Sequence, residues 1–284
     1  MMKLRAVACA LLLLLGPPLA AHAQVEMPVK YASVLEEPSR APDLVHRYGN
    51  APSQFAQLWL PDSSNDAKGV VVLVHGGCWL NAYNIDHIAP LATALSDEGF
   101  AVWAPEYRRV GERGGGWPGT FADVQRAVDV MVSVPELQPY VANTLLVGHS
   151  AGGHLALWLA SRSKDLRPKP VGFRGAVGLA AITDLVSYAS GTNSCELVTP
   201  KLLGGTPEQL PRRYEKYSPS KLPVREGVAL LRGDQDRIVG EGQVSAMKTA
   251  RAQTLAGAGH FDWIHPRTPA FEMLIAELRS FLAP

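Results

Sequence analysis

An apolar segment runs directly into a serine surrounded by small residues in the stretch TLLVGHSAGGH at 144–154. The following segment, LALWLASRS, has the spacing of apolar residues typical of an amphipathic helix. The pattern Gly148-x-Ser150-x-Gly152 therefore stands at a strand-to-helix junction. At such a sharp turn the serine hydroxyl is raised above the sheet, and a side chain in place of either glycine would collide with neighbouring backbone. This feature predicts a nucleophile, Ser150, at the end of a buried strand.

A serine hydroxyl is a weak nucleophile at neutral pH, so it needs a base to take its proton and a third group to orient that base. The late part of the chain supplies both, because GDQD at 233–236 ends an apolar segment and GHF at 259–261 precedes the last helical pattern. We predict His260 as the base and Asp236 as the orienting acid. Asp234 is the alternative acid, but its position favours a turn residue that hydrogen-bonds local backbone.

The stretch HGGCW at 75–79 follows the most apolar segment of the chain. The tetrahedral intermediate of acyl transfer carries a negative oxygen that backbone N–H groups must meet, and glycine lets the backbone approach a substrate closely. The His75 side chain is expected to hold this loop in place rather than to react. The predicted oxyanion donors are Gly76, Gly77, Cys78 and the N–H of Ala151.

Aromatic residues near these motifs could wall an apolar or aromatic substrate, namely Trp79, Tyr83 and Trp117, with packing in the core or at the rim as the alternative for each. His149 and His154 flank the serine, and packing or hydrogen bonding explains them better than zinc binding. A zinc site requires three or more convergent ligands at suitable spacing, which the sequence does not offer. We therefore expect no metal and no organic cofactor.

Strand-like and helix-like segments alternate along the chain, which predicts an α/β fold with a mainly parallel sheet and helices on both faces. The segment at about 187–222 is rich in Gly, Pro, Ser and Thr and is expected to be a lid-like or loop excursion over the site. The expected strands are 55–60, 69–75, 100–105, 145–147, 176–181 and 228–232, and the expected helices are 88–98, 121–132, 151–162 and 270–282.

Residues 1–23 have a basic start, an apolar run to Leu15, a Gly-Pro-Pro break and small residues at Ala21 and Ala23. This pattern predicts a signal peptide cleaved after Ala23, because the apolar run is too short for a membrane anchor. Residues 24–284 are then expected to form a single domain that works outside the cytoplasm. Cleavage would remove Cys9 and leave Cys78 and Cys195, which could form one disulfide or remain two buried thiols.

The charges are nearly balanced, with 27 Lys and Arg, 26 Asp and Glu, and a net charge of +1. The basic residues are scattered, so we expect no nucleic-acid partner and no stable membrane anchor after cleavage. A small-molecule substrate is the expected partner, whereas the sequence leaves the oligomeric state open.

Five motifs together resemble the α/β-hydrolase superfamily: HGGCW at 75–79, PEYRR at 105–109, GHSAGGHLA at 148–156, GDQD at 233–236 and GHFD at 259–262. They are most similar to the branch that holds carboxylesterases of the hormone-sensitive-lipase type and kynurenine formamidases. The resemblance implies a three-layer α/β-hydrolase fold, with the triad on Ser150, Asp236 and His260. Cys78 stands where lipase-like esterases usually carry a third glycine, and HGG-x-W is closer to the formamidases.

The sequence thus predicts an exported serine hydrolase of the carboxylesterase or arylformamidase type, which cleaves a small ester or an aryl formamide through an acyl-enzyme. A kynurenine formamidase-like amidase is the alternative. An exported peptidase of the prolyl-oligopeptidase type is disfavoured because such enzymes usually carry an extra propeller domain. A non-catalytic binding protein with the same fold is disfavoured because such proteins typically lose a member of the triad.

Overall fold

One eight-stranded sheet forms the centre of the computed structural model, which describes residues 25–62, 68–162, 172–223 and 227–283. The expected signal peptide at 1–23 lies outside the described residues. The strand order is β1-β2-β4-β3-β5-β6-β7-β8, with β1 and β2 antiparallel to their neighbours and the remaining pairs parallel. The strands are β1 (Leu44–Arg47), β2 (Phe55–Trp59), β3 (Val70–Val74), β4 (Ala101–Pro105), β5 (Thr144–His149), β6 (Phe173–Leu179), β7 (Val228–Gly233) and β8 (Arg251–Leu255).

The central strands are buried on both faces, which explains their continuous apolar sequences. In β3 every residue is buried, and successive side chains alternate between the two sides of the sheet. Val72 and Val74 belong to one hydrophobic cluster, whereas Val71 and Leu73 belong to the other. The sheet is therefore the middle layer between two separate cores.

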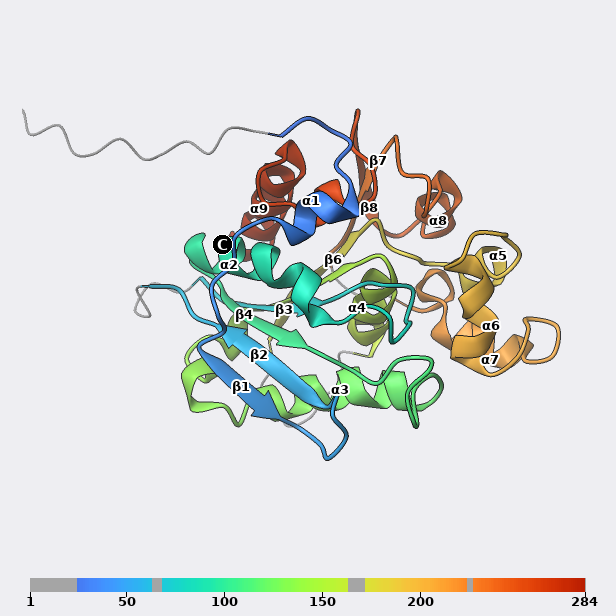
Figure 1. Ribbon diagram of the computed structural model, residues 1–284, viewed down its shortest axis with the longest axis horizontal. Helices are drawn as coiled ribbons and strands as arrows, with labels where there is room; N and C mark the ends of the chain where they lie inside the picture. The colour runs from blue at the N-terminus through green and yellow to red at the C-terminus, as the bar shows by residue number, and fades with distance from the viewer. Residues whose placement is uncertain (1–24, 63–67, 163–171, 224–226, 284) are drawn as a thin grey trace, which may run out of the picture.

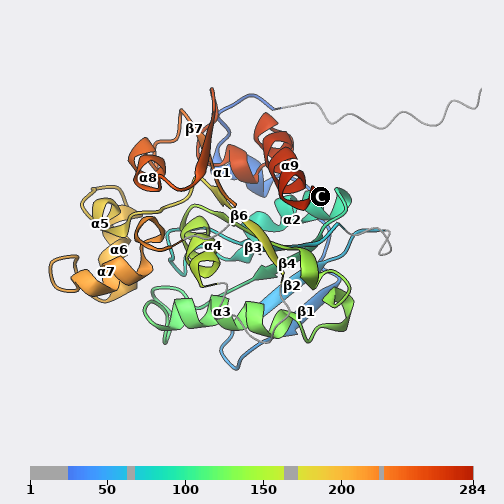
Figure 2. The same cartoon turned by 180° about the vertical axis from the view of Figure 1, so that it is seen from behind.

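Helices cover both faces of the sheet (Figures 1 and 2). On one face lie α2 (Ala89–Asp97), α9 (Pro269–Leu282) and the short α1 (Tyr31–Leu35), whose Val34 is fully buried. On the other face lie α3 (Gly119–Met131) and α4 (Ala151–Ser161). This arrangement confirms the predicted three-layer α/β fold.

The expected excursion at 187–222 is more ordered than its composition indicates, because it contains several short helices. They are α5 (Leu185–Tyr188), α6 (Thr199–Leu203) and α7 (Pro211–Tyr217), which gather at one end of the molecule (Figure 1), with 3-10 turns at 196–198 and 219–221. The last short helix, α8 (Glu241–Ala246), follows β7. Prolines begin α7 and occupy the first turn of α6, where the missing N–H costs no hydrogen bond.

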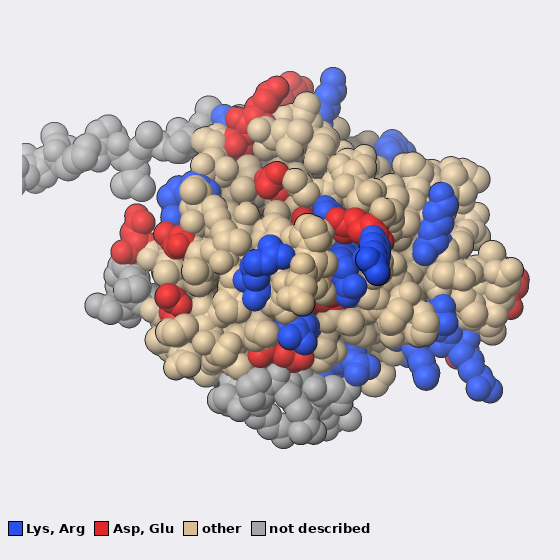
Figure 3. All heavy atoms as spheres, turned by 60° about the horizontal axis from the view of Figure 1, so that its bottom comes forward, with Lys and Arg blue, Asp and Glu red and all other residues tan. Residues whose placement is uncertain are grey.

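The surface carries charges of both signs, and the face in Figure 3 shows Lys and Arg as well as Asp and Glu side chains. Among the described helices, none combines the length and the apolar character that a membrane span requires.

Candidate active site

The turn between β5 and α4 holds Ser150 in a conformation that few residues adopt. Its backbone has φ 55° and ψ −119°, and its N–H donates to Leu179 O at 2.8 Å. A Cβ added at Gly152 would lie 2.1 Å from Val74 O, and one added at Gly148 would lie 2.2 Å from Gly152 O. Both glycines are therefore required by close backbone contact, as the sequence predicted. The strained serine stands at the first turn of α4.

His260 and Asp236 form a hydrogen-bonded pair, with His260 Nδ1 2.8 Å from Asp236 Oδ2. The other carboxylate oxygen, Oδ1, accepts the N–H groups of Ile238 at 2.8 Å and Val239 at 2.9 Å. Because an ionised carboxylate only accepts, Nδ1 of His260 carries a hydrogen, so in the neutral imidazole the lone pair is on Nε2. Ser150 and His260 line the same cavity.

The environment of Asp236 keeps its carboxylate ionised. Burial alone would raise its pKa, but the hydrogen bond and charge of His260 and the two backbone N–H groups outweigh burial and lower it. Asp234, the alternative acid, accepts a hydrogen bond from Gly257 N at 2.8 Å and holds a local turn. The structure thus pairs His260 with Asp236, the acid preferred from the sequence.

A cavity of about 170 Å³ opens beside the serine. Its described lining holds no Asp, Glu, Lys or Arg. The sequence reasoning missed four of the lining residues, which no local motif marks as pocket residues: Tyr31, His87, Ile238 and Ile264. The lining residues are Tyr31, Gly77, Cys78, Tyr83, His87, His149, Ser150, Ser194, Cys195, Ile238, His260, Phe261 and Ile264.

The loop after β3 lines the same cavity as Ser150, through Gly77 and Cys78. Gly77, Cys78 and Trp79 have φ of 99°, 53° and 57°, so three successive residues are left-handed. Within the described part of the chain, the N–H groups of Gly77 and Cys78 have no hydrogen-bond acceptor. The Ala151 N–H, in the first turn of α4, has no intrahelical acceptor either. Gly76, also predicted as a donor, packs against Ser150, since an added Cβ would lie 3.2 Å from the serine Cβ.

Cys78 and Cys195 are joined by a disulfide, with Cα atoms 4.8 Å apart. The bond connects the loop after β3 to the excursion, across 117 residues of sequence. Both cysteines line the cavity, and so does Ser194. The excursion therefore reaches the site through the segment that the disulfide holds.

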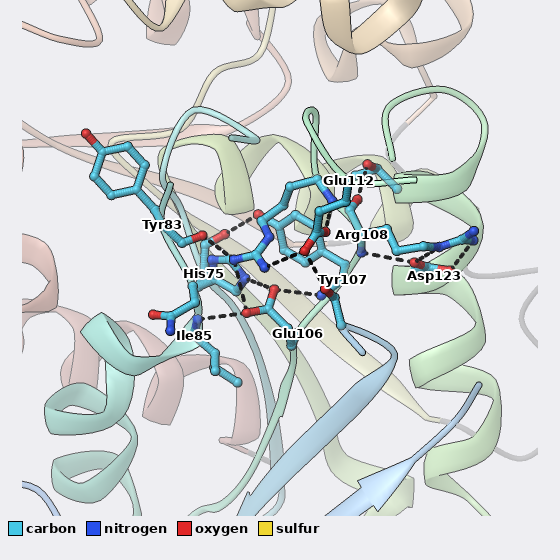
Figure 4. Close-up of polar contacts among 12 residues, drawn as sticks. His75, Tyr83, Ile85, Glu106, Tyr107, Arg108, Glu112 and Asp123 are labelled. Atoms are coloured by element: carbon cyan, nitrogen blue, oxygen red, sulfur yellow. Dashed lines mark hydrogen bonds and ion pairs between the residues drawn. The ribbon is translucent and has the colours of Figure 1, made fainter. Parts of the chain in front are cut away.

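Glu106, which follows β4, is the centre of a buried polar network (Figure 4). Its Oε1 lies 2.8 Å from His75 Nε2 and accepts the Tyr107 N–H at 2.8 Å. Its Oε2 accepts Ile85 N at 3.0 Å and lies 3.2 Å from Arg109 Nη1. One carboxylate thus fixes the start of the loop at 75–79 and the segment that leads into α2, in accordance with the holding role expected for His75.

This network also reaches the cavity wall. Arg109 donates a hydrogen bond to the carbonyl oxygen of Tyr83, and the Tyr107 hydroxyl donates to His75 O at 2.8 Å. Burial alone would raise the pKa of Glu106, but its contacts with His75, Arg109 and the Tyr107 N–H outweigh burial and lower it. Glu106 is therefore an ionised group inside the protein that is satisfied on both oxygens.

Two of the three predicted pocket aromatics lie elsewhere. Trp79 is fully buried, with its ring centroid 5.4 Å from His154 and 6.3 Å from Tyr188, because the left-handed backbone turns it into the core. Trp117 is 39% exposed and stacks under Arg213, whose guanidinium carbon lies 3.4 Å from the ring centroid. Only Tyr83 of the three lines the cavity beside Ser150.

His149 and His87 also line the cavity, and both are neutral. Burial, followed by the nearby His260 charge, lowers the pKa of His149 well below its ordinary value. Burial and the neighbouring His75 lower that of His87 to about 3. His149 Nε2 donates to His260 O at 2.9 Å, and His154 Nε2 lies 2.8 Å from Tyr217 O. Among the described residues, no group of three or more His, Cys, Asp or Glu is arranged to hold a metal ion.

Comparison with known proteins identifies similar sequences. The family model named BD-FAE matches residues 56–250. A kynurenine formamidase of Danio rerio is 32% identical over 141 residues. That alignment covers 49% of this chain and 45% of the relative, so the chain matches less than half of that protein's length.

Solved esterase structures share the fold. Esterase B of Lactobacillus rhamnosis has a TM-score of 0.70 at 20% identity, covering 88% of each chain. A truncated carbohydrate esterase from gut microbiota has a TM-score of 0.69 at 18% identity, covering 87% of this chain and 98% of the other. Esterase 2 of Thermogutta terrifontis, phosphonylated by sarin, has a TM-score of 0.67 at 17% identity, covering 86% of this chain and 96% of the other.

Replacing Glu106 by glutamine should lower the free energy of unfolding by about 3 kcal/mol at pH 7, because breaking a buried ion pair leaves its partners uncompensated. Since the folded-state pKa of Glu106 lies below its ordinary value of 4.5, its contribution is present above about pH 4.5 and is lost as the pH falls further. The difference between wild type and Glu106→Gln should therefore shrink in acid. Urea unfolding of both proteins at a series of pH values measures this difference in the free energy of unfolding.

The matched control is Glu98→Gln, which removes an exposed ion pair with Arg279 at 2.6 Å. This control should cost less than about 1 kcal/mol. Equal losses for Glu98→Gln and Glu106→Gln would contradict the role assigned to Glu106.

Proposed function

The chain belongs to the BD-FAE family and has the α/β-hydrolase fold, and from this premise we propose that it is a serine hydrolase of small, neutral carboxylic esters. The observation that carries the proposal is the hydrogen-bonded pair of His260 and Asp236, which shares one cavity with the strained Ser150. This is the arrangement that serine nucleophiles require: a base with a free nitrogen and an acid that fixes its tautomer.

In the proposed mechanism Ser150 Oγ attacks the ester carbonyl carbon while His260 Nε2 takes the serine proton. Asp236 stabilises the positive charge that forms on the imidazole. The oxygen of the tetrahedral intermediate meets the N–H groups of Gly77, Cys78 and Ala151. His260 then donates its proton to the departing alcohol, which leaves an acyl-enzyme. Water attacks the acyl-enzyme with His260 again as the base, and the acid is released.

The cavity lining supports a neutral substrate. His87 and His149 are uncharged, and the described lining supplies no acidic or basic partner outside the proposed triad. A substrate with an ammonium or carboxylate group near the scissile bond would leave that charge uncompensated on binding.

A neutral aryl formamide is the second candidate substrate. The similarity to a kynurenine formamidase favours it, since that relative's name implies cleavage of a formamide. The same mechanism would serve, with an amine as the leaving group.

We further propose that the protein is exported and acts outside the cytoplasm on a small molecule rather than on nucleic acid. The sequence pattern of residues 1–23 and the disulfide between Cys78 and Cys195 support this localisation, because structural disulfides persist in oxidising compartments.

Substitution of two neighbouring acids, Asp236 and Asp234, tests the proposed triad. Asp236→Asn should lower kcat on p-nitrophenyl acetate by about 10³-fold to 10⁴-fold, because the amide no longer holds His260 in the required tautomer. Asp234→Asn should leave kcat close to that of the wild type, since its carboxylate faces Gly257. Steady-state kinetics with Ser150→Ala as the blank gives both values. A similar loss for both asparagine variants would refute the assignment of Asp236.

Three compounds test the proposal that the substrate is uncharged: p-nitrophenyl acetate, formanilide and N-formylkynurenine. We expect kcat/KM to be highest for the ester, and to be at least about tenfold higher for formanilide than for N-formylkynurenine, whose charged groups find no partner in the cavity. Both formamides contain an aryl formamide bond, and N-formylkynurenine adds an ortho acyl side chain that carries an ammonium and a carboxylate group. Preference for N-formylkynurenine over formanilide would contradict a neutral substrate.

A further inference from the structure

A segment near the N-terminus packs against the loop that carries His260. The N–H of Val29 donates to Asp262 Oδ2 at 3.2 Å, and the same carboxylate oxygen accepts Gly259 N at 2.8 Å. Pro28 lies against Gly259, where an added Cβ would come within 2.9 Å of the proline Cβ. Residues 28 and 29 are thus bound to the residues on both sides of His260.

The far end of the same segment is fixed as well. Ser33 Oγ lies 3.2 Å from His265 Nε2. The Glu37 carboxylate accepts a hydrogen bond from Arg267 Nε at 2.8 Å and a second one from another nitrogen of the same guanidinium group. The Val34 side chain between them is fully buried. We call residues 28–37 the N-terminal strap. Because both of its ends are held, the strap has a defined position beside the site.

Tyr31 is the strap residue that enters the cavity lining. Its ring centroid lies 5.3 Å from that of Phe261 and 5.9 Å from those of Tyr83 and His87. The contact with Tyr83 is edge-to-face, at an interplanar angle of 88°. Tyr31 therefore forms one wall of the cavity, packed between residues of two other segments.

The cavity of about 170 Å³ is smaller than the 300–1,000 Å³ that is usual for sites of drug-sized ligands. The BD-FAE match begins at residue 56, so Tyr31 lies outside the matched part of the chain. We propose that Tyr31 is a specificity-determining residue that restricts this site to small acyl groups, and that the N-terminal strap positions it. This inference rests on the proposed ester hydrolysis at Ser150.

The test compares p-nitrophenyl acetate with p-nitrophenyl octanoate, with kcat and KM measured separately, for the wild type, Tyr31→Ala and Tyr31→Phe. Tyr31→Ala removes the wall, so the octanoate-to-acetate ratio of kcat/KM should rise by about tenfold or more, mainly through a lower KM for octanoate. Tyr31→Phe keeps the ring and should retain the wild-type ratio. Leu35→Ala is the matched control, because Leu35 is on the same helix but 55% exposed.

Labelling by a fluorophosphonate probe shows whether each variant keeps a reactive serine. An unchanged ratio in a labelled Tyr31→Ala protein would overturn the inference while leaving the proposed function in place. Equal loss of both activities, together with loss of labelling, would also overturn it, because Tyr31 would then support the His260 loop rather than select substrates. Failure of the proposed function looks different: the wild type itself would show no Ser150-dependent hydrolysis.

Discussion

The close approach of two backbone segments governs the geometry of this site. The start of α4 lies directly against the end of β3, so closely that a single methyl group at Gly152 would overlap the carbonyl oxygens of Val74 and His75. This contact sets Ser150 beside the loop that begins at His75. The backbone contact between the start of α4 and the end of β3 therefore sets the serine beside the predicted oxyanion donors. Ser150, at the N-terminus of α4, has the positive φ that such a strand-to-helix turn requires.

Three further interactions hold the loops around this centre. Glu106 fixes His75 and the chain around Tyr83 and Ile85 from inside the protein (Figure 4). The disulfide holds Cys78 and the excursion together, and Asp262 binds the N-terminal strap to the His260 loop. Functional residues often lie on loops that a rigid scaffold positions, and here each of these loops is anchored. Such anchoring keeps reacting groups in position without rearrangement during the reaction.

The sequence was sufficient to predict the elements that have a strong local signal, such as an apolar run or a fixed spacing of glycines. Continuous apolar runs marked the doubly buried strands β3 and β5, and glycine spacing marked the turn at Ser150. The edge strands β1 and β8 were missed because their residues are half-buried or exposed and lack an apolar run. The order of motifs placed Asp236 and His260 together. By contrast, the contribution of Tyr31 depends on contacts across more than two hundred residues, and the burial of Trp79 depends on a left-handed backbone at a non-glycine residue. Neither has a local sequence signal.

The central claim is that Ser150 is a nucleophile activated by His260. The most direct measurement is mass spectrometry of the intact protein and its peptides after treatment with a fluorophosphonate. The account predicts one adduct, on the peptide that contains Ser150, that is absent from Ser150→Ala and greatly slowed in His260→Ala. Absence of an adduct on the wild-type serine, or equal labelling of the His260→Ala protein, would contradict it and favour a non-catalytic protein with this fold.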